Sequence, residues 1–167
     1  YQLSVETQLS SEIELQGIAP ASAVVKLKKV MAEHRGMSSK LFGGDTSVAS
    51  ELRAQASKVE AQLQQVRNLA STATDDALVL GKVNDVERMW SELKAGVDAR
   101  AYSEAESTAK HSDLIARSDL LISELSKHFL LSYDPVAASY HLIIANLQNL
   151  PRLADNLGKV RGGGAGI

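Results

Sequence analysis

The spacing of apolar residues constrains the fold of this chain more than any other feature, because it repeats in alternating steps of four and three. Such a heptad seam places apolar side chains on one face of a helix, whereas a strand would alternate at every second residue. The seams are Val136, Tyr140, Ile143, Leu147, Leu150, Ala154 and Leu157; Leu52, Ala56, Val59, Leu63, Val66 and Ala70; Val83, Val86, Trp90, Leu93 and Val97; and Ile115, Ile122, Leu125 and Phe129. The sequence therefore predicts helices that each bury one stripe.

The first helix carries its apolar residues on one face up to Leu41 and contains Pro20. Proline lacks the backbone donor and clashes with the preceding turn, so we expect a kink near this residue. Gly43-Gly44 can adopt the left-handed conformation that ends many helices, and Asp45 or Ser47 can cap the next one. The first helix is therefore predicted to end at these glycines.

A weaker break between Thr74 and Gly81 predicts an interrupted second helix, with pieces at 47–73 and 83–98. Ser103 with Glu106 has the spacing of a capping box and starts the third helix. Asp134-Pro135 supplies a cap and a preset first residue for the fourth. The short turn before it makes these two helices antiparallel. The prediction is an all-α, antiparallel up-down-up-down four-helix bundle with a kinked first helix.

Length and composition predict one domain and restrict its partners. The chain has 167 residues, which suits one bundle over 1–161, followed by a glycine-rich stretch at 162–167. That stretch is expected to be a flexible tail or the start of a second membrane span. The net charge of -2 gives no basic excess for phosphate backbones, so nucleic acid is not an expected partner.

The motifs of bundle enzymes are missing from the sequence. It contains no Glu-x-x-His pair, no His-Glu-x-x-His and no cysteine, which excludes thiolate catalysis and thiolate metal sites. Gly43-Gly44-Asp45 lacks the preceding strand and the following lysine of a phosphate loop, which favours a turn. We therefore expect no enzymatic activity, no metal and no cofactor.

Polar residues on the apolar seams are the candidate binding residues, because their burial costs free energy unless they find partners. His34 lies on the seam of the first helix, one turn from Ser38, and Arg35 is beside it. These residues could be a core histidine with a snorkelling arginine, or an anion-binding pair. Tyr140 on the fourth seam could equally be a core residue with a tethered hydroxyl or a ligand contact.

The depth of these residues in the predicted bundle suggests one site. Arg35 lies about seven residues before the end of the first helix and Tyr140 about five after the start of the fourth, which predicts a common bundle end. Tyr133 lies in the turn predicted to cover that end. Arg117 is further down the third helix and is expected to serve another layer. The predicted ligand-binding residues are Arg35, His34, Ser38, Tyr133, Tyr140 and Arg117.

The segments 14–17, 32–38 and 44–45 resemble the first periplasmic helix of methyl-accepting chemotaxis proteins of proteobacteria. The segments 131–135, 139–140 and 149–162 resemble the last helix before their second membrane span. This resemblance implies the periplasmic sensor domain of an inner-membrane receptor. In related aspartate-type receptors, arginines on the first helix hold a ligand carboxylate, and only Arg35 matches that role here.

The leading hypothesis is a sensor in which a small organic acid or amino acid binds between helices and shifts the equilibrium between two packings. The fourth helix would pass this shift to the membrane through flanking spans. The alternative is a structural or protein-binding bundle without a small-molecule ligand. A second stripe on the first helix, formed by Ile18, Val25, Ala32 and Gly36, predicts a homodimer.

Overall fold

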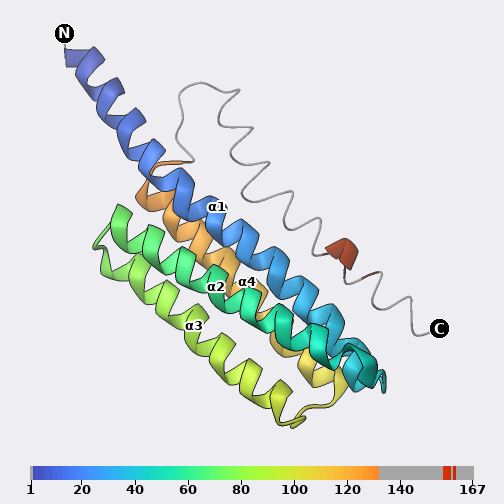
Figure 1. The fold of residues 1–167 in the computed structure, drawn as a ribbon. Helices are drawn as coiled ribbons and strands as arrows, with labels where there is room; N and C mark the ends of the chain where they lie inside the picture. Colours follow the sequence, from blue (N-terminus) through green and yellow to red (C-terminus); the bar gives the residue numbers. More distant parts are fainter. Residues whose placement is uncertain (1, 132–155, 159, 161–167) are drawn as a thin grey trace.

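The computed structural model describes residues 2–131, 156–158 and 160. These residues form four long helices that pack together, and none of them forms a strand (Figure 1). The elements are α1 (Gln2–Phe42), the 3-10 helix η1 (Thr46–Val48), α2 (Ala49–Ala73), α3 (Ala77–Asp98) and α4 (Glu104–His128). The predicted all-α class is therefore confirmed.

The apolar seams predicted from the sequence meet in the core. Every member of the predicted α2 and α3 seams is at most 5% exposed, from Leu52 to Ala70 and from Val83 to Val97. The seam predicted between Ile115 and Phe129 is buried in the same way on α4 and at the residue that follows it. These stripes supply the burial of apolar area that stabilises helices far beyond their intrinsic propensity.

The predicted end of the first helix and the predicted start of the third helix, which is α4, are confirmed. α1 ends at Phe42, Gly44 has a φ of 103° in the left-handed region, and the Asp45 carboxylate accepts the Ser47 backbone N–H at 3.1 Å. At the start of α4, Ser103 and Glu106 form the expected reciprocal capping box. α1 continues as one helix through Pro20, and a bend at that residue stays a prediction.

The prediction of a single interrupted second helix is wrong, because its two pieces are separate helices that fold back on each other (Figure 1). Thr74 is extended, and the Asp76 carboxylate caps α3 by accepting the backbone N–H groups of Leu78 and Val79. Arg67 near the end of α2 pairs with Glu87 in the middle of α3, whereas the earlier Glu60 pairs with the later Lys94. The three residues between α2 and α3 thus reverse the chain, and α3 begins at Ala77 rather than near residue 83.

Because the chain reverses between α2 and α3, α4 ends beside the first half of α1 and not beside the end of α1. α4 starts beside the end of α1, where the Ser39 hydroxyl lies 2.5 Å from the Glu104 carboxylate. It stops beside Gly17, where Phe129 packs against the helix backbone. Gly17 and Arg35 are 18 residues apart, or about 27 Å along a helix. The prediction that the end of this helix lies beside Arg35 is therefore wrong. The predicted fourth helix lies almost entirely outside the described residues, and the stretch 162–167 lies wholly outside them.

Gly17 is required by the close approach of Phe129. A Cβ atom at Gly17 would overlap the Cβ atom of Phe129, which cannot rotate away because it is fixed to the backbone. Gly17→Ala is therefore expected to lower the free energy of unfolding by about 1–3 kcal/mol, the usual cost of overpacking. Urea denaturation followed by circular dichroism measures this change.

Gly36→Ala is the matched control on the same helix, because nothing lies within 4 Å of the added methyl group. The exposed alanine is expected to raise the free energy of unfolding by about 0.5–1 kcal/mol through its higher helix propensity. Equal effects of the two substitutions would contradict the packing of Phe129 on Gly17.

Candidate functional site

Four buried polar side chains meet at one level of the helical core. They are His34 and Ser38 of α1 and Ser107 and His111 of α4, each at most 1% exposed, and we call them the polar layer. Within each helix the two residues are four positions apart, which places them on the same face. α3 contributes Trp90 at the edge of this layer, with its ring centroid 4.9 Å from that of His34.

The hydrogen bonds of the polar layer determine which nitrogen atoms carry protons. His111 Nδ1 lies 2.7 Å from the Ser107 carbonyl oxygen, which can only accept, so this nitrogen is the donor. In a neutral ring His111 Nε2 must then accept, and His34 Nδ1 donates to it at 2.8 Å. The two imidazoles therefore form a directed bridge between α1 and α4, and His34 Nε2 is the nitrogen without a proton.

The surroundings keep both imidazoles neutral. Burial lowers the pKa of His34 to about 3, with smaller contributions from His111 and from the positive charge of Lys94. Burial lowers the pKa of His111 to about 4, against the opposing hydrogen bond to Ser107 and together with the charge of Arg35. Near neutral pH the bridge is therefore uncharged.

Arg35 lies next to the polar layer and is 7% exposed. Its Nη1 group donates to the Ser112 hydroxyl of α4 at 3.4 Å, and its Nη2 atom is 3.4 Å from the position that a Cβ atom of Gly158 would occupy. The guanidinium therefore lies between α4 and the segment at 156–158. A buried guanidinium can bind a carboxylate through charge-assisted hydrogen bonds.

The structure brings three of the predicted site residues together, namely His34, Arg35 and Ser38. Arg117 is separate from them, because its side chain is 39% exposed and lies 4.0 Å from the Asp85 carboxylate of α3. Tyr133 and Tyr140 lie outside the described residues.

Four further residues of the site were not predicted from the sequence, namely Ser107, His111 and Ser112 of α4 and Trp90 of α3. A signal for His111 was present, since the α4 seam extends back by four residues from Ile115 to His111, and by four more to Ser107. A polar residue at a seam position is buried once the helix packs. Trp90 gave no such signal, because tryptophan at a seam position is ordinarily core.

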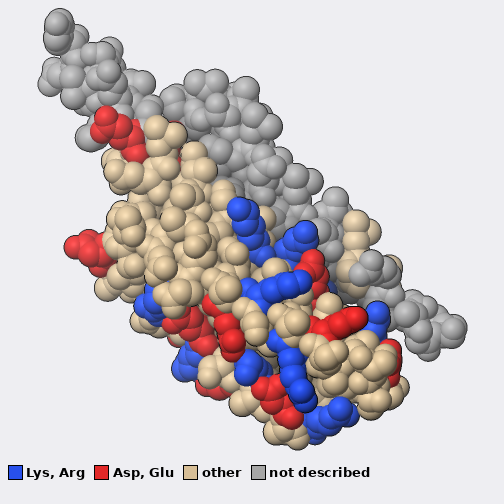
Figure 2. Space-filling model, in the orientation of Figure 1, with Lys and Arg blue, Asp and Glu red and all other residues tan. Residues whose placement is uncertain are grey.

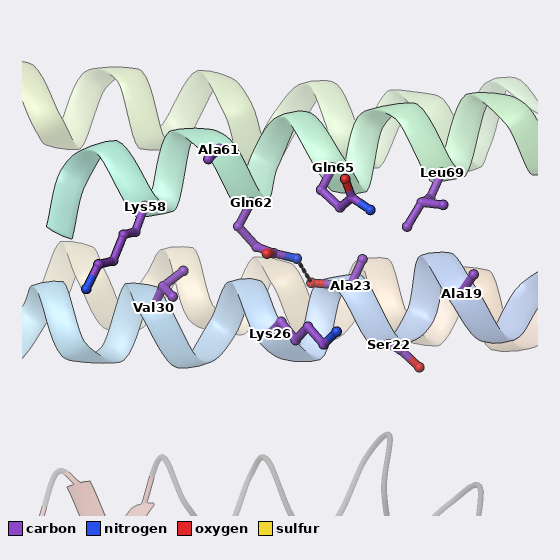
Figure 3. A pocket seen from close by; sticks show the side chains of 10 residues that line it. All are labelled: Ala19, Ser22, Ala23, Lys26, Val30, Lys58, Ala61, Gln62, Gln65 and Leu69. Carbon is purple, nitrogen blue, oxygen red and sulfur yellow. Dashed lines mark hydrogen bonds between the residues drawn. The ribbon is translucent and has the colours of Figure 1, made fainter. Parts of the chain in front are cut away.

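A shallow groove of about 710 Å³ runs between α1 and α2 (Figure 3). Lys26 and Lys58 line it from opposite sides, and the Gln62 amide crosses it to donate to the Ala23 carbonyl at 3.0 Å. No residue of the polar layer lines this groove. It is therefore a second surface feature, separate from Arg35.

Charged side chains gather on the half of the visible face that includes the end of α1 (Figure 2). Between Glu14 and Lys26, by contrast, the sequence of α1 has no charged residue.

Across the described helices, no three histidine or carboxylate side chains converge as a metal site would need. None of these helices is long and apolar enough to cross a bilayer. Comparisons with protein-family models, with curated proteins and with solved structures found no match to this chain.

Proposed function

We propose that this chain is an antiparallel up-down-up-down helical bundle that acts as the extracytoplasmic ligand-sensing domain of a chemoreceptor. The observation that carries the proposal is a buried arginine, Arg35, beside a layer of buried polar side chains. Opposite helix directions are supported by paired positions, since Gln55 reaches Val30 whereas the later Gln62 reaches the earlier Ala23. Opposite directions of α1 and α4 are supported in the same way, since Lys28 reaches Asp119 whereas the later His34 reaches the earlier His111.

The charges around the polar layer favour an anionic ligand over a cation. The positive charge of Arg35 lowers the pKa of His111, and that of Lys94, which also pairs with Glu60 and Asp98, lowers the pKa of His34. A ligand carboxylate would gain charge-assisted hydrogen bonds from the guanidinium, with the Ser112 hydroxyl as a second donor. The proposed ligand is therefore a small organic acid or an amino acid bound through its carboxylate.

The position of Arg35 also suggests how a bound ligand would change the packing of the helices. Its guanidinium touches α4 and lies beside Gly158, so a ligand there would affect how α1 packs on both. A ligand shifts such an equilibrium only by the difference in its affinity for the two packings. In the proposed receptor this shift passes through the C-terminal segment to a membrane span, in an inner-membrane protein with its sensor in the periplasm.

A homodimer is part of the same proposal. Ile18 is 43% exposed and Gly36 has open space around it, so both positions on the predicted stripe are accessible on α1. A second copy packing on this stripe would bury Ile18. Sedimentation of the domain should show a dimer whose formation is weakened by Ile18→Asp, whereas a monomer at high concentration would contradict it.

A structural or protein-binding bundle is the second candidate, and two observations favour it. The imidazole bridge already has hydrogen-bond partners, so it fixes the register of α1 on α4 without a ligand. In addition, Gly158 lies beside Arg35, which is 33 residues from Gln2, or about 50 Å along a helix. Two membrane spans joined directly to these two segments would meet the bundle at opposite ends.

A thermal-shift screen with organic acids and amino acids separates the two candidates. A ligand that binds only the folded domain stabilises it by about 2.7 kcal/mol at a hundredfold excess over its Kd. For a domain of this size we expect the melting temperature to rise by about 5–10 °C. Arg35→Ala should abolish the rise. If no acid shifts the wild-type protein, the structural candidate is favoured.

A further inference from the structure

The hydrogen bond between His34 and His111 joins α1 to α4 inside the core, and its chemistry depends on protonation. It requires His111 Nε2 to be free of a proton, because that nitrogen accepts from His34 Nδ1 at 2.8 Å. Once both facing nitrogens carry protons, two donors oppose each other and the bond is lost. The bridge is thus a contact that only neutral imidazoles, or one shared proton, can maintain.

Two charged side chains in the described part of the structure lower the pKa of the imidazoles in the bridge. Arg35 adjoins it from α1 and Lys94 from α3, and both are positive. Lys94 is itself occupied by Asp98 at 3.2 Å and by Glu60 of α2 at 3.7 Å. From α4 the bridge meets the Ser107 carbonyl, and among the described residues no carboxylate is hydrogen-bonded to either imidazole. Among the described residues, an added proton therefore gains no hydrogen bond to a carboxylate, while burial opposes its charge.

We propose that the His34–His111 bridge is an acid-sensitive latch, which holds α1 against α4 near neutral pH and releases it when the surroundings become acidic. The proton would then be a stimulus of this domain in its own right. This function does not depend on the small-molecule ligand, and it is tested without one.

The direction of the effect follows from comparing the closed and open states. In the closed state the pKa of His34 is lowered to about 3 and that of His111 to about 4, whereas open imidazoles have their ordinary value near 6.5. The open state therefore binds more protons below about pH 6.5, and acid favours it. The closed state has its full stability above that pH and loses it as the pH falls toward 4.

The size of the effect follows from the same linkage. With two neutral imidazoles in the closed state, the opening constant should rise roughly 600-fold between pH 7 and pH 5. Amide hydrogen exchange of the peptides 30–38 and 107–115, corrected for the intrinsic pH dependence of exchange, measures this rise. Trp90 is the single tryptophan of the chain and lies beside His34, so its quenching by acrylamide gives an independent readout.

The decisive comparison uses three proteins: the wild type, the double variant His34→Gln with His111→Gln, and the control His128→Gln. His128 is partly exposed and lies outside the latch, near Thr74 and Asp76. We expect the wild type and the control to show the full acid-induced rise in opening and the double variant to lose most of it. Equal pH profiles in all three proteins would overturn the proposal.

A second measurement applies even if the double variant does not fold. The imidazole NMR signals of the wild-type protein should show both rings neutral, with the proton on Nδ1, from pH 7 to about pH 5. Titration of either ring near pH 6.5 within the folded protein would also overturn the latch, because the closed state would then hold the proton without strain.

Discussion

Replacing Asp119 with alanine should lower the free energy of unfolding by about 3–5 kcal/mol, because the substitution leaves a buried ammonium group without its partner. The side chain of Lys28 is 4% exposed, and its Nζ atom lies 2.5 Å from the Asp119 carboxylate, which is 23% exposed. An ammonium group at this depth is costly unless it is paired. Urea denaturation at neutral pH, followed by circular dichroism, measures the loss.

Two controls distinguish the effect of the unpaired buried charge on stability from the effect of removing a side chain. Glu92 pairs with Arg88 at 3.0 Å on the surface of α3, where both side chains are more than 60% exposed. Glu92→Ala should therefore change stability by less than about 0.5 kcal/mol. The double substitution Lys28→Met with Asp119→Leu should recover most of the loss, since it removes both charges. A double variant as unstable as Asp119→Ala would show that the unpaired ammonium is not the cause.

The sequence predicted the helices and their buried faces well, because both follow from local periodicity and capping. The seams of α2 and α3, the helix end at Gly44 and the capping box at Ser103 are all present. Periodicity, however, does not specify whether a helix continues after a break or folds back. A seam on each side of Thr74 is compatible with both arrangements, and the structure has the reversal.

The candidate site, like the fold, could be predicted from the sequence only in part. His34, Arg35 and Ser38 were predicted because they share one helix, where spacing alone places them together. Their partners come from α4, and choosing His111 required the register of α4 against α1, which a single sequence does not provide. The reversal at Thr74 also determines which end of α4 lies near Arg35, so the prediction that this helix ends there is wrong.

The second large effect concerns ligand binding at Arg35. Arg35→Ala should weaken the binding of an acidic ligand by roughly 2–4 kcal/mol, the scale for losing a desolvated charged contact. Ser112→Ala should cost less, about 0.5–1.5 kcal/mol, since it removes one neutral hydrogen bond. Circular dichroism of both variants establishes whether they keep the helical content of the wild type.

The most direct test of a sensor with its site at Arg35 is a calorimetric titration of three proteins with an acid that stabilises the wild type. Arg117→Ala is the matched control, because Arg117 lies on the surface beside Asp85 and away from the polar layer. We predict that the wild type and Arg117→Ala bind the acid with similar affinity and that Arg35→Ala binds it at least about thirtyfold more weakly. Unchanged binding by Arg35→Ala together with loss of binding by Arg117→Ala would place the site elsewhere and contradict the account.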